Sequence, residues 1–120
     1  MSAIYLADWA ESGYEGMIGD FNDFSGQIDF AQGCEILLAY YCYEDYSGEA
    51  FVLYRKDGQI FEVNGSHCSC YGLEGQWEPE ETSVDELMHR INNGQLGTGY
   101  GTGNTFAAEL CSVLEKVGAA

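Results

Sequence analysis

Basic residues are scarce in this 120-residue sequence, which has 4 lysines and arginines against 20 aspartates and glutamates. The formal net charge is therefore −16 at pH 7. Proteins that bind nucleic acid directly need a basic surface to neutralise phosphates, so this balance argues against direct nucleic-acid binding. For the same reason an anionic membrane surface is disfavoured as a partner.

Long hydrophobic runs are also missing, because no apolar stretch reaches the roughly 18 residues that a transmembrane helix needs. The first residues, MSAIYLADWAESGYEG, contain acids and no basic segment, which is not typical of a secretory signal peptide. We therefore expect a cytoplasmic protein. The 5 cysteines are an odd number, and a disulfide framework is not expected in that compartment.

Aromatic residues, by contrast, are abundant, with 9 Tyr, 6 Phe and 2 Trp in a chain that is 46% hydrophobic. Such a composition excludes a disordered acidic tail and supplies a core for one domain of common size. An acidic surface on a folded domain has three interpretations. It keeps the protein soluble, it binds cations, or it competes for a basic surface that normally holds DNA or RNA phosphates.

Residues 34–64 carry the clearest structural pattern. Three β-rich runs, CEILLAYYCY, EAFVLYRK and QIFEVN, follow one another along the chain. Asp57-Gly58 between the last two is typical of a two-residue hairpin turn, and pairing across it places Tyr54 opposite Phe61. The pattern predicts a three-stranded antiparallel β-meander.

Helices are expected before and after this meander. Apolar residues within 4–18 indicate an amphipathic helix that is broken by Gly13 and Gly16. After an irregular Cys/His segment over 65–82, Ser83 and Glu86 form a capping box, which predicts a helix over 83–93. A glycine-rich connector over 94–103 then leads to a last helix over 104–117. The expected fold is a single α+β domain in which two or three helices pack on the meander.

The densest group of potential metal ligands is His67-Cys68-Ser69-Cys70. Thiolate and imidazole are ligands that Zn²⁺ prefers, and zinc takes four of them in a tetrahedron. Because His67, Cys68 and Cys70 supply at most three, another residue must complete the site. His89, on the following helix, is the first candidate. Its rival is Cys42, which the expected strand pairing puts opposite Phe51 and near the start of this segment.

The cysteines are also compatible with two roles that need no metal. Free cysteines are often buried in a core, and Cys34, Cys42 and Cys111 stand beside apolar neighbours as such residues do. The second role is nucleophilic or redox chemistry at Cys68 or Cys70, with His89 as base, but no signature of a cysteine enzyme surrounds them. The glycine stretch lacks the Lys-Ser/Thr of a phosphate-binding loop, and we expect no enzyme.

Aromatic and acidic residues are interleaved directly after the Cys/His segment. Trp77 has two interpretations: it covers a metal or loop core, or it anchors a basic partner from within an acidic patch, as aromatic hot spots do. Besides Trp77, the expected partner-binding group consists of Glu74, Glu78, Glu80, Glu81, Asp85 and Glu86.

Residues 49–90 resemble a box found in small proteins of phages and prophages, with the motif G-S-H-C-S-C-x-G-L-E-x-Q-W-x-P-E-E. The small size, the acidity and the Cys/His cluster are also similar to those of anti-CRISPR inhibitors, some of which stop target DNA from loading onto a type II RNA-guided nuclease. The resemblance implies a phage inhibitor in the host cytoplasm, with a structural zinc ion and a host type II CRISPR effector nuclease as partner. The alternatives are a zinc-braced phage or bacterial adaptor without a defence role and a Cys- or metal-dependent enzyme.

Overall fold

The computed structural model describes residues 3–21, 33–44, 47–67, 77–93, 98–99, 103–104 and 106–119 of the chain. Both helices and strands occur, so the expected α+β class is confirmed. The chain divides into two compact units, Met1–Glu81 and Thr82–Ala120, which we call the first and the second unit.

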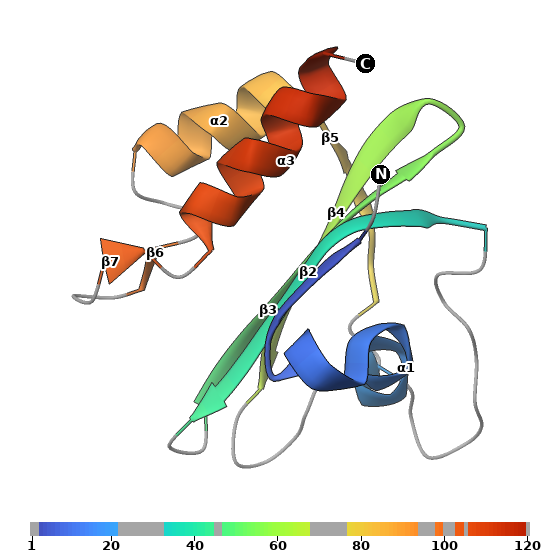
Figure 1. Ribbon diagram of the computed structural model, residues 1–120, viewed down its shortest axis with the longest axis vertical. Helices are drawn as coiled ribbons and strands as arrows, with labels where there is room; N and C mark the ends of the chain where they lie inside the picture. Colours follow the sequence, from blue (N-terminus) through green and yellow to red (C-terminus); the bar gives the residue numbers. More distant parts are fainter. Residues whose placement is uncertain are drawn as a thin grey trace. The chain divides into compact units, whose positions relative to one another are not determined.

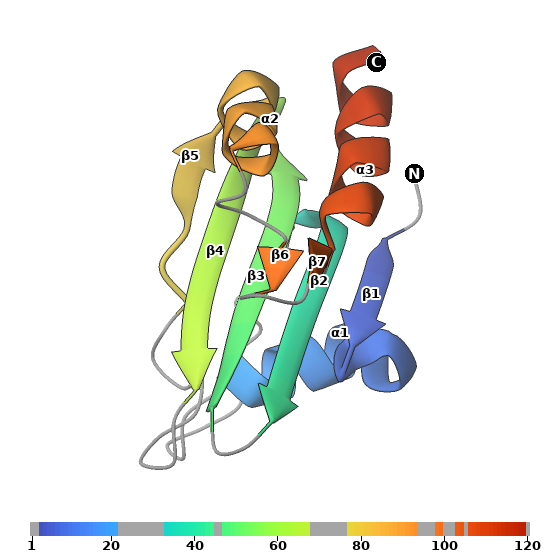
Figure 2. The same cartoon turned by 90° about the vertical axis from the view of Figure 1, so that its left-hand side faces the viewer.

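A mixed five-stranded sheet forms the body of the first unit, with strands side by side in the order β1-β2-β3-β4-β5 (Figure 2). The strands span Ile4–Ala7, Glu35–Glu44, Ser47–Lys56, Gln59–His67 and Glu80–Thr82. The three central strands are the predicted antiparallel meander. The prediction of three strands was incomplete, because β1 and β5 extend the meander at its edges.

The turn between β3 and β4 forms as its sequence predicts. Asp57 has φ 55° and Gly58 has φ 79°, the left-handed values that both central positions of this hairpin require. Tyr54 is paired with Phe61, as expected. The strand β4 continues to His67, so the start of the segment over 65–82 is regular rather than irregular.

The pairing of β2 with β3 differs from the expectation by two residues. Tyr40, not Cys42, lies opposite Phe51, and Cys42 pairs with Glu49. The cause is a shorter connection than the expected turn, since both strands extend until Glu44 pairs with Ser47. From Leu38 onward, a shift of two residues keeps each side chain on its expected face. Between Ile36 and Leu38 the register shifts by a further residue at a β-bulge or irregularity.

The N-terminal segment was expected to be one broken helix, and this was wrong for its first residues. Ile4–Ala7 form β1, which pairs with β2 in parallel, and the chain then turns at Ala7 with φ 56°. The helix α1 spans Trp9–Phe21 and is kinked at Gly13, where φ is 59° and ψ is −140°. The predicted break at Gly13 is therefore present.

The core of the first unit lies between α1 and one face of the sheet (Figure 1). Each large apolar side chain that is fully buried there contributes about 1.5–3 kcal/mol to stability. The buried residues of this cluster are Trp9, Met17, Phe21, Ile36, Ala39, Tyr41, Ala50, Val52, Tyr54 and Val63.

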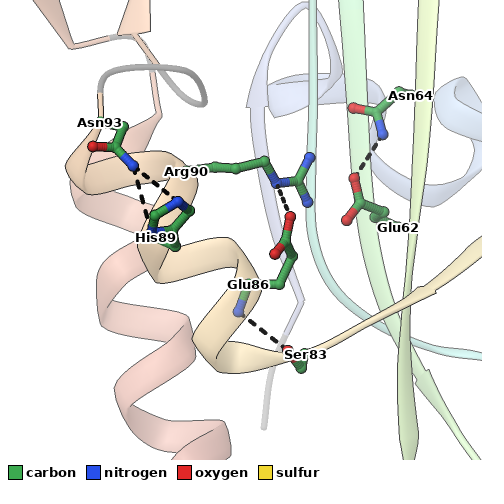
Figure 3. A network of polar contacts seen from close by, with 7 residues as sticks. All are labelled: Glu62, Asn64, Ser83, Glu86, His89, Arg90 and Asn93. Atoms are coloured by element: carbon green, nitrogen blue, oxygen red, sulfur yellow. Dashed lines mark hydrogen bonds and ion pairs between the residues drawn. The ribbon is translucent and has the colours of Figure 1, made fainter.

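The other face of the meander is apolar as well. Leu38 and Leu53 are fully buried there, and they pair across β2 and β3. Glu62 pairs with Leu53 and is the one buried charged residue among those described, with 5% of its surface exposed. The side-chain amide of Asn64 donates a hydrogen bond to Oε1 of Glu62 at 2.8 Å (Figure 3).

The second unit contains the helix α2 (Val84–Asn92), the short strands β6 (Thr98–Gly99) and β7 (Gly103–Asn104), and the helix α3 (Ala107–Ala119). The N-cap half of the predicted capping box is present, since Ser83 Oγ accepts a hydrogen bond from the N–H of Glu86 at 3.1 Å (Figure 3). Within this unit α2 contacts α3.

Two expectations for this unit were wrong. The connector over 94–103 includes β6 and the first residue of β7, which pair as a small antiparallel ladder. Asn104 lies in β7, so the last helix begins later than expected, at Ala107, and it continues past Gly118. Glycine-rich sequence predicts turns but carries no side-chain signal for strands, which explains the first error.

Candidate functional site

Negative charge is concentrated in the first unit. Sixteen of the 20 acidic residues and two of the 4 basic residues lie in Met1–Glu81, which gives this unit a net charge of −14 out of −16. No lysine or arginine precedes Arg55 in the sequence. Arg55 is itself paired, because its Nε and Nη2 donate to Glu35 Oε1 at 3.0 Å and 2.8 Å.

The first β-strand and helix carry part of this charge. Asp8 follows β1, and Glu11, Glu15 and Asp20 lie on α1; all four side chains are exposed. Because helix and sheet hold these carboxylates in place, they keep a fixed spacing that a disordered tail would lack. The sequence showed that acids recur here but did not identify them as a site. The signal that could have found them is the absence of any base before residue 55.

The first part of the expected partner-binding group lies at the opposite edge of the sheet. Glu80 and Glu81 are on the edge strand β5, Glu78 lies two residues before it, and all three are exposed. Glu74 is outside the described residues. The three described carboxylates are therefore accessible to a partner.

The last part of that group belongs to the second unit. Asp85 and Glu86 are exposed in the first turn of α2, where they also interact favourably with the helix dipole. Glu86 Oε1 is 3.4 Å from Arg90 Nε in an i,i+4 ion pair (Figure 3). Helix stability alone is thus enough to explain these two acids.

Trp77 packs against the core of the first unit. Its ring meets that of Phe21 edge-on at 5.1 Å and lies nearly parallel to that of Tyr54 at 6.0 Å. Tyr54 in turn stacks on Phe61 at 5.2 Å, so three rings lie in a row. The indole is only half-buried by these contacts. Trp77 thus covers part of the core of the first unit, and its role as an anchor for a partner stays a prediction.

Two of the expected zinc ligands, Cys68 and Cys70, are outside the described residues. His67 is the last residue of β4, and its backbone pairs with Gly48 of β3. His89 is exposed on α2, with Nε2 3.1 Å from the side-chain nitrogen of Asn93 (Figure 3). Within the described ranges, no three or more His, Cys, Asp or Glu residues form a group that could hold a metal ion.

Cys42, the rival ligand, lies at the same end of the sheet as His67. It pairs with Glu49, which pairs with Ser66, the residue before His67. The thiol is half-buried and not in a disulfide. Burial raises the pKa of Tyr40 well above its usual 10.0, and Cys42, which is hydrogen-bonded to Tyr40, adds to this shift.

Known proteins and membrane topology add little to this picture. None of the helices in the described part of the chain is long and apolar enough to cross a membrane. No protein-family model, curated protein or solved structure matches this sequence.

Proposed function

We propose that this chain is a non-enzymatic phage inhibitor that binds a host type II RNA-guided DNA nuclease and blocks the loading of target DNA. The observation that carries the proposal is the net charge of −14 in the first unit, part of which is carried by exposed acids on α1 and β5. Such nucleases hold their nucleic acids in positively charged channels. A compact polyanion is attracted to the same channels and competes with DNA for them.

The local ion pairing supports a role in binding rather than in solvation alone. In the first unit the guanidinium of Arg55 is taken up by Glu35, and Lys56 is the other base that this unit contains. The exposed acids on α1 and β5 therefore have almost no internal counter-charge. A basic partner gains from neutralising them, and electrostatic attraction also speeds its encounter with the chain.

The test is DNA binding by a guide-loaded type II nuclease, with this protein added before or after the target DNA. We expect DNA binding to be lost only when the protein is added first, because both compete for one surface. Inhibition should weaken steeply between about 50 and 200 mM salt, since exposed charges are screened over about a Debye length. No inhibition in either order would contradict the proposal.

A pair of matched variants locates the effect in the first unit. Glu80→Gln/Glu81→Gln removes two charges from β5, and Glu109→Gln/Glu115→Gln removes two from α3. We expect the first variant to inhibit about fivefold less well, because each exposed ion pair contributes up to about 1 kcal/mol. The second should inhibit like the parent protein.

A structural zinc ion held by His67, Cys68 and Cys70 is part of this proposal. Thiolates and an imidazole suit zinc, which would brace the chain that follows β4. The fourth ligand stays open between His89 and Cys42. Strand pairing places Cys42 at the same end of the sheet as His67 but in line with Ser66, and successive residues of a strand face opposite sides of the sheet.

Metal analysis of purified variants tests this part separately. Cys70→Ser should lower the zinc content and the melting temperature together, and Cys42→Ser should do the same if it is the fourth ligand. Cys111→Ser, on α3, is the control. Unchanged zinc content and melting temperature in Cys70→Ser would contradict a zinc site, and loss in His89→Asn rather than Cys42→Ser would reassign the fourth ligand.

A further inference from the structure

We infer that the outer edge of β1 is a docking site for an extended, lysine- or arginine-bearing segment of the partner, which adds to the sheet as one more strand. This inference rests on the proposed function for the cationic character of the partner. The inference goes beyond the proposed function because it names β1 as the element that the partner contacts and an extended strand as the conformation of the partner's segment.

The first support is the backbone of β1. This strand is at the edge of the sheet, with β2 as its neighbour on one side. In the described part of the chain, the backbone hydrogen bonds of Ile4–Ala7 are those of the ladder with β2. An edge strand points half of its N–H and C=O groups away from the sheet, and an extended peptide can pair with them.

The second support is the contrast between the two edges. Natural sheets protect edges with charged residues, proline, bulges or very short strands. β5 has three of these four protections: it spans three residues, carries Glu80 and Glu81, and follows Pro79. β1, with the sequence IYLA, is also short, at four residues, but it has no charge, no proline and no bulge, and Ile4, Tyr5 and Leu6 are only half-buried.

The third support is charge, which selects the occupant. Asp8 ends the β1 region, and Glu11 and Glu15 lie on α1, which contacts β1; all three are exposed. A second copy of this chain would bring another net charge of −16 to the same edge and be repelled. A cationic strand would instead place positive side chains near these carboxylates while its main chain pairs with β1.

A direct test uses a short peptide of alternating lysine and valine and the intact protein. We expect the peptide to shift the amide resonances of Ile4–Ala7 and to slow the hydrogen exchange of the amides that face outward. The control peptide has the same sequence with alternate backbone nitrogens methylated, which keeps its charge and removes strand pairing. Equal binding of both peptides, or shifts confined to other elements, would overturn the inference.

Two double variants then test the charges. Glu11→Gln/Glu15→Gln should weaken peptide binding about fivefold, whereas Glu109→Gln/Glu115→Gln should change it less than twofold. Equal losses in both would overturn the inference. Peptide pairing with β1 without any inhibition of the nuclease would refute the proposed function alone, because the edge would still accept a cationic strand.

Discussion

The indole N–H of Trp9 donates a hydrogen bond to Oδ2 of Asp20 at 2.7 Å, although the two residues are 11 positions apart. In a straight α-helix, 11 residues rise about 16 Å along the axis, which is too far for this contact. The kink at Gly13 brings the two ends of α1 together. Asp20, exposed at the surface, thereby fixes the 1%-exposed indole in the core.

Removing this carboxylate should therefore destabilise the fold. We expect Asp20→Ala to lower the free energy of unfolding by about 1–2 kcal/mol, because a buried indole N–H loses a charge-assisted hydrogen bond. Chemical denaturation measures the change. Glu15→Ala, an exposed acid on the same helix, is the control and should change it by less than about 0.5 kcal/mol. Equal effects of the two substitutions would contradict a specific role of Asp20.

Two glycines of α1 should respond in opposite ways to alanine. A Cβ at Gly16 would lie 2.5 Å from Cβ of Ser12, and the kinked backbone leaves little room to relieve this clash. A Cβ at Gly19 meets nothing within 4 Å. We expect Gly16→Ala to destabilise the protein by about 1–3 kcal/mol and Gly19→Ala to stabilise it by about 0.5–1 kcal/mol. Thermal unfolding of both variants checks the prediction, and a shift of the same sign in both would refute it.

The stability of the protein should fall in alkaline solution. Burial raises the pKa of Tyr40, so the folded state keeps its proton when the unfolded chain ionises above its usual pKa of 10.0. This contribution to stability is present in full below pH 10 and is lost as the pH rises further, by about 1.4 kcal/mol per pH unit for one such group. Tyr40→Phe should make the loss between pH 10 and 11.5 shallower. The same slope in both proteins would show that Tyr40 does not cause it.

The hydroxyl groups of Thr82 and Ser83, at the start of α2, have different surroundings. Ser83 Oγ caps the helix, whereas the buried Oγ1 of Thr82 has no hydrogen-bond partner in the described structure. We expect Ser83→Ala to cost about 1 kcal/mol of unfolding free energy. Thr82→Val should be neutral or stabilising, because it replaces an unpaired hydroxyl with a methyl group. The reverse order in denaturation experiments would assign the cap to Thr82.

Local signals made the centre of the fold predictable. Asp57-Gly58 requires left-handed backbone and so defined the β3–β4 register, and the pair Ser83 and Glu86 marked the start of α2. β1 was missed because four apolar residues before a helix fit either structure, and its pairing partner Leu38 is 34 residues away. β5 was missed because EET has no apolar residue that would indicate a strand.

The candidate site was less predictable than the fold. Residue types indicated zinc ligands and an acidic group but not how they are placed. Strand pairing is needed to see that Cys42 and His67 share one end of the sheet. The half-buried state of Trp77 depends on Phe21, which is 56 residues away in sequence and carries no sequence signal of that contact.

The parallel pairing of β1 with β2 also bears on the order of folding. The meander joins neighbours through short turns, whereas Ile4 and Leu38 meet only after a loop of more than thirty residues has closed. Loop closure of that length costs chain entropy before any contact compensates it, so we expect β1 to be the last strand to join. By the same reasoning it is the first to detach, and the docking edge is then the least protected part of the sheet in hydrogen exchange. A strand added by a partner would pair with β1, keep it from detaching and slow the unfolding of the whole first unit.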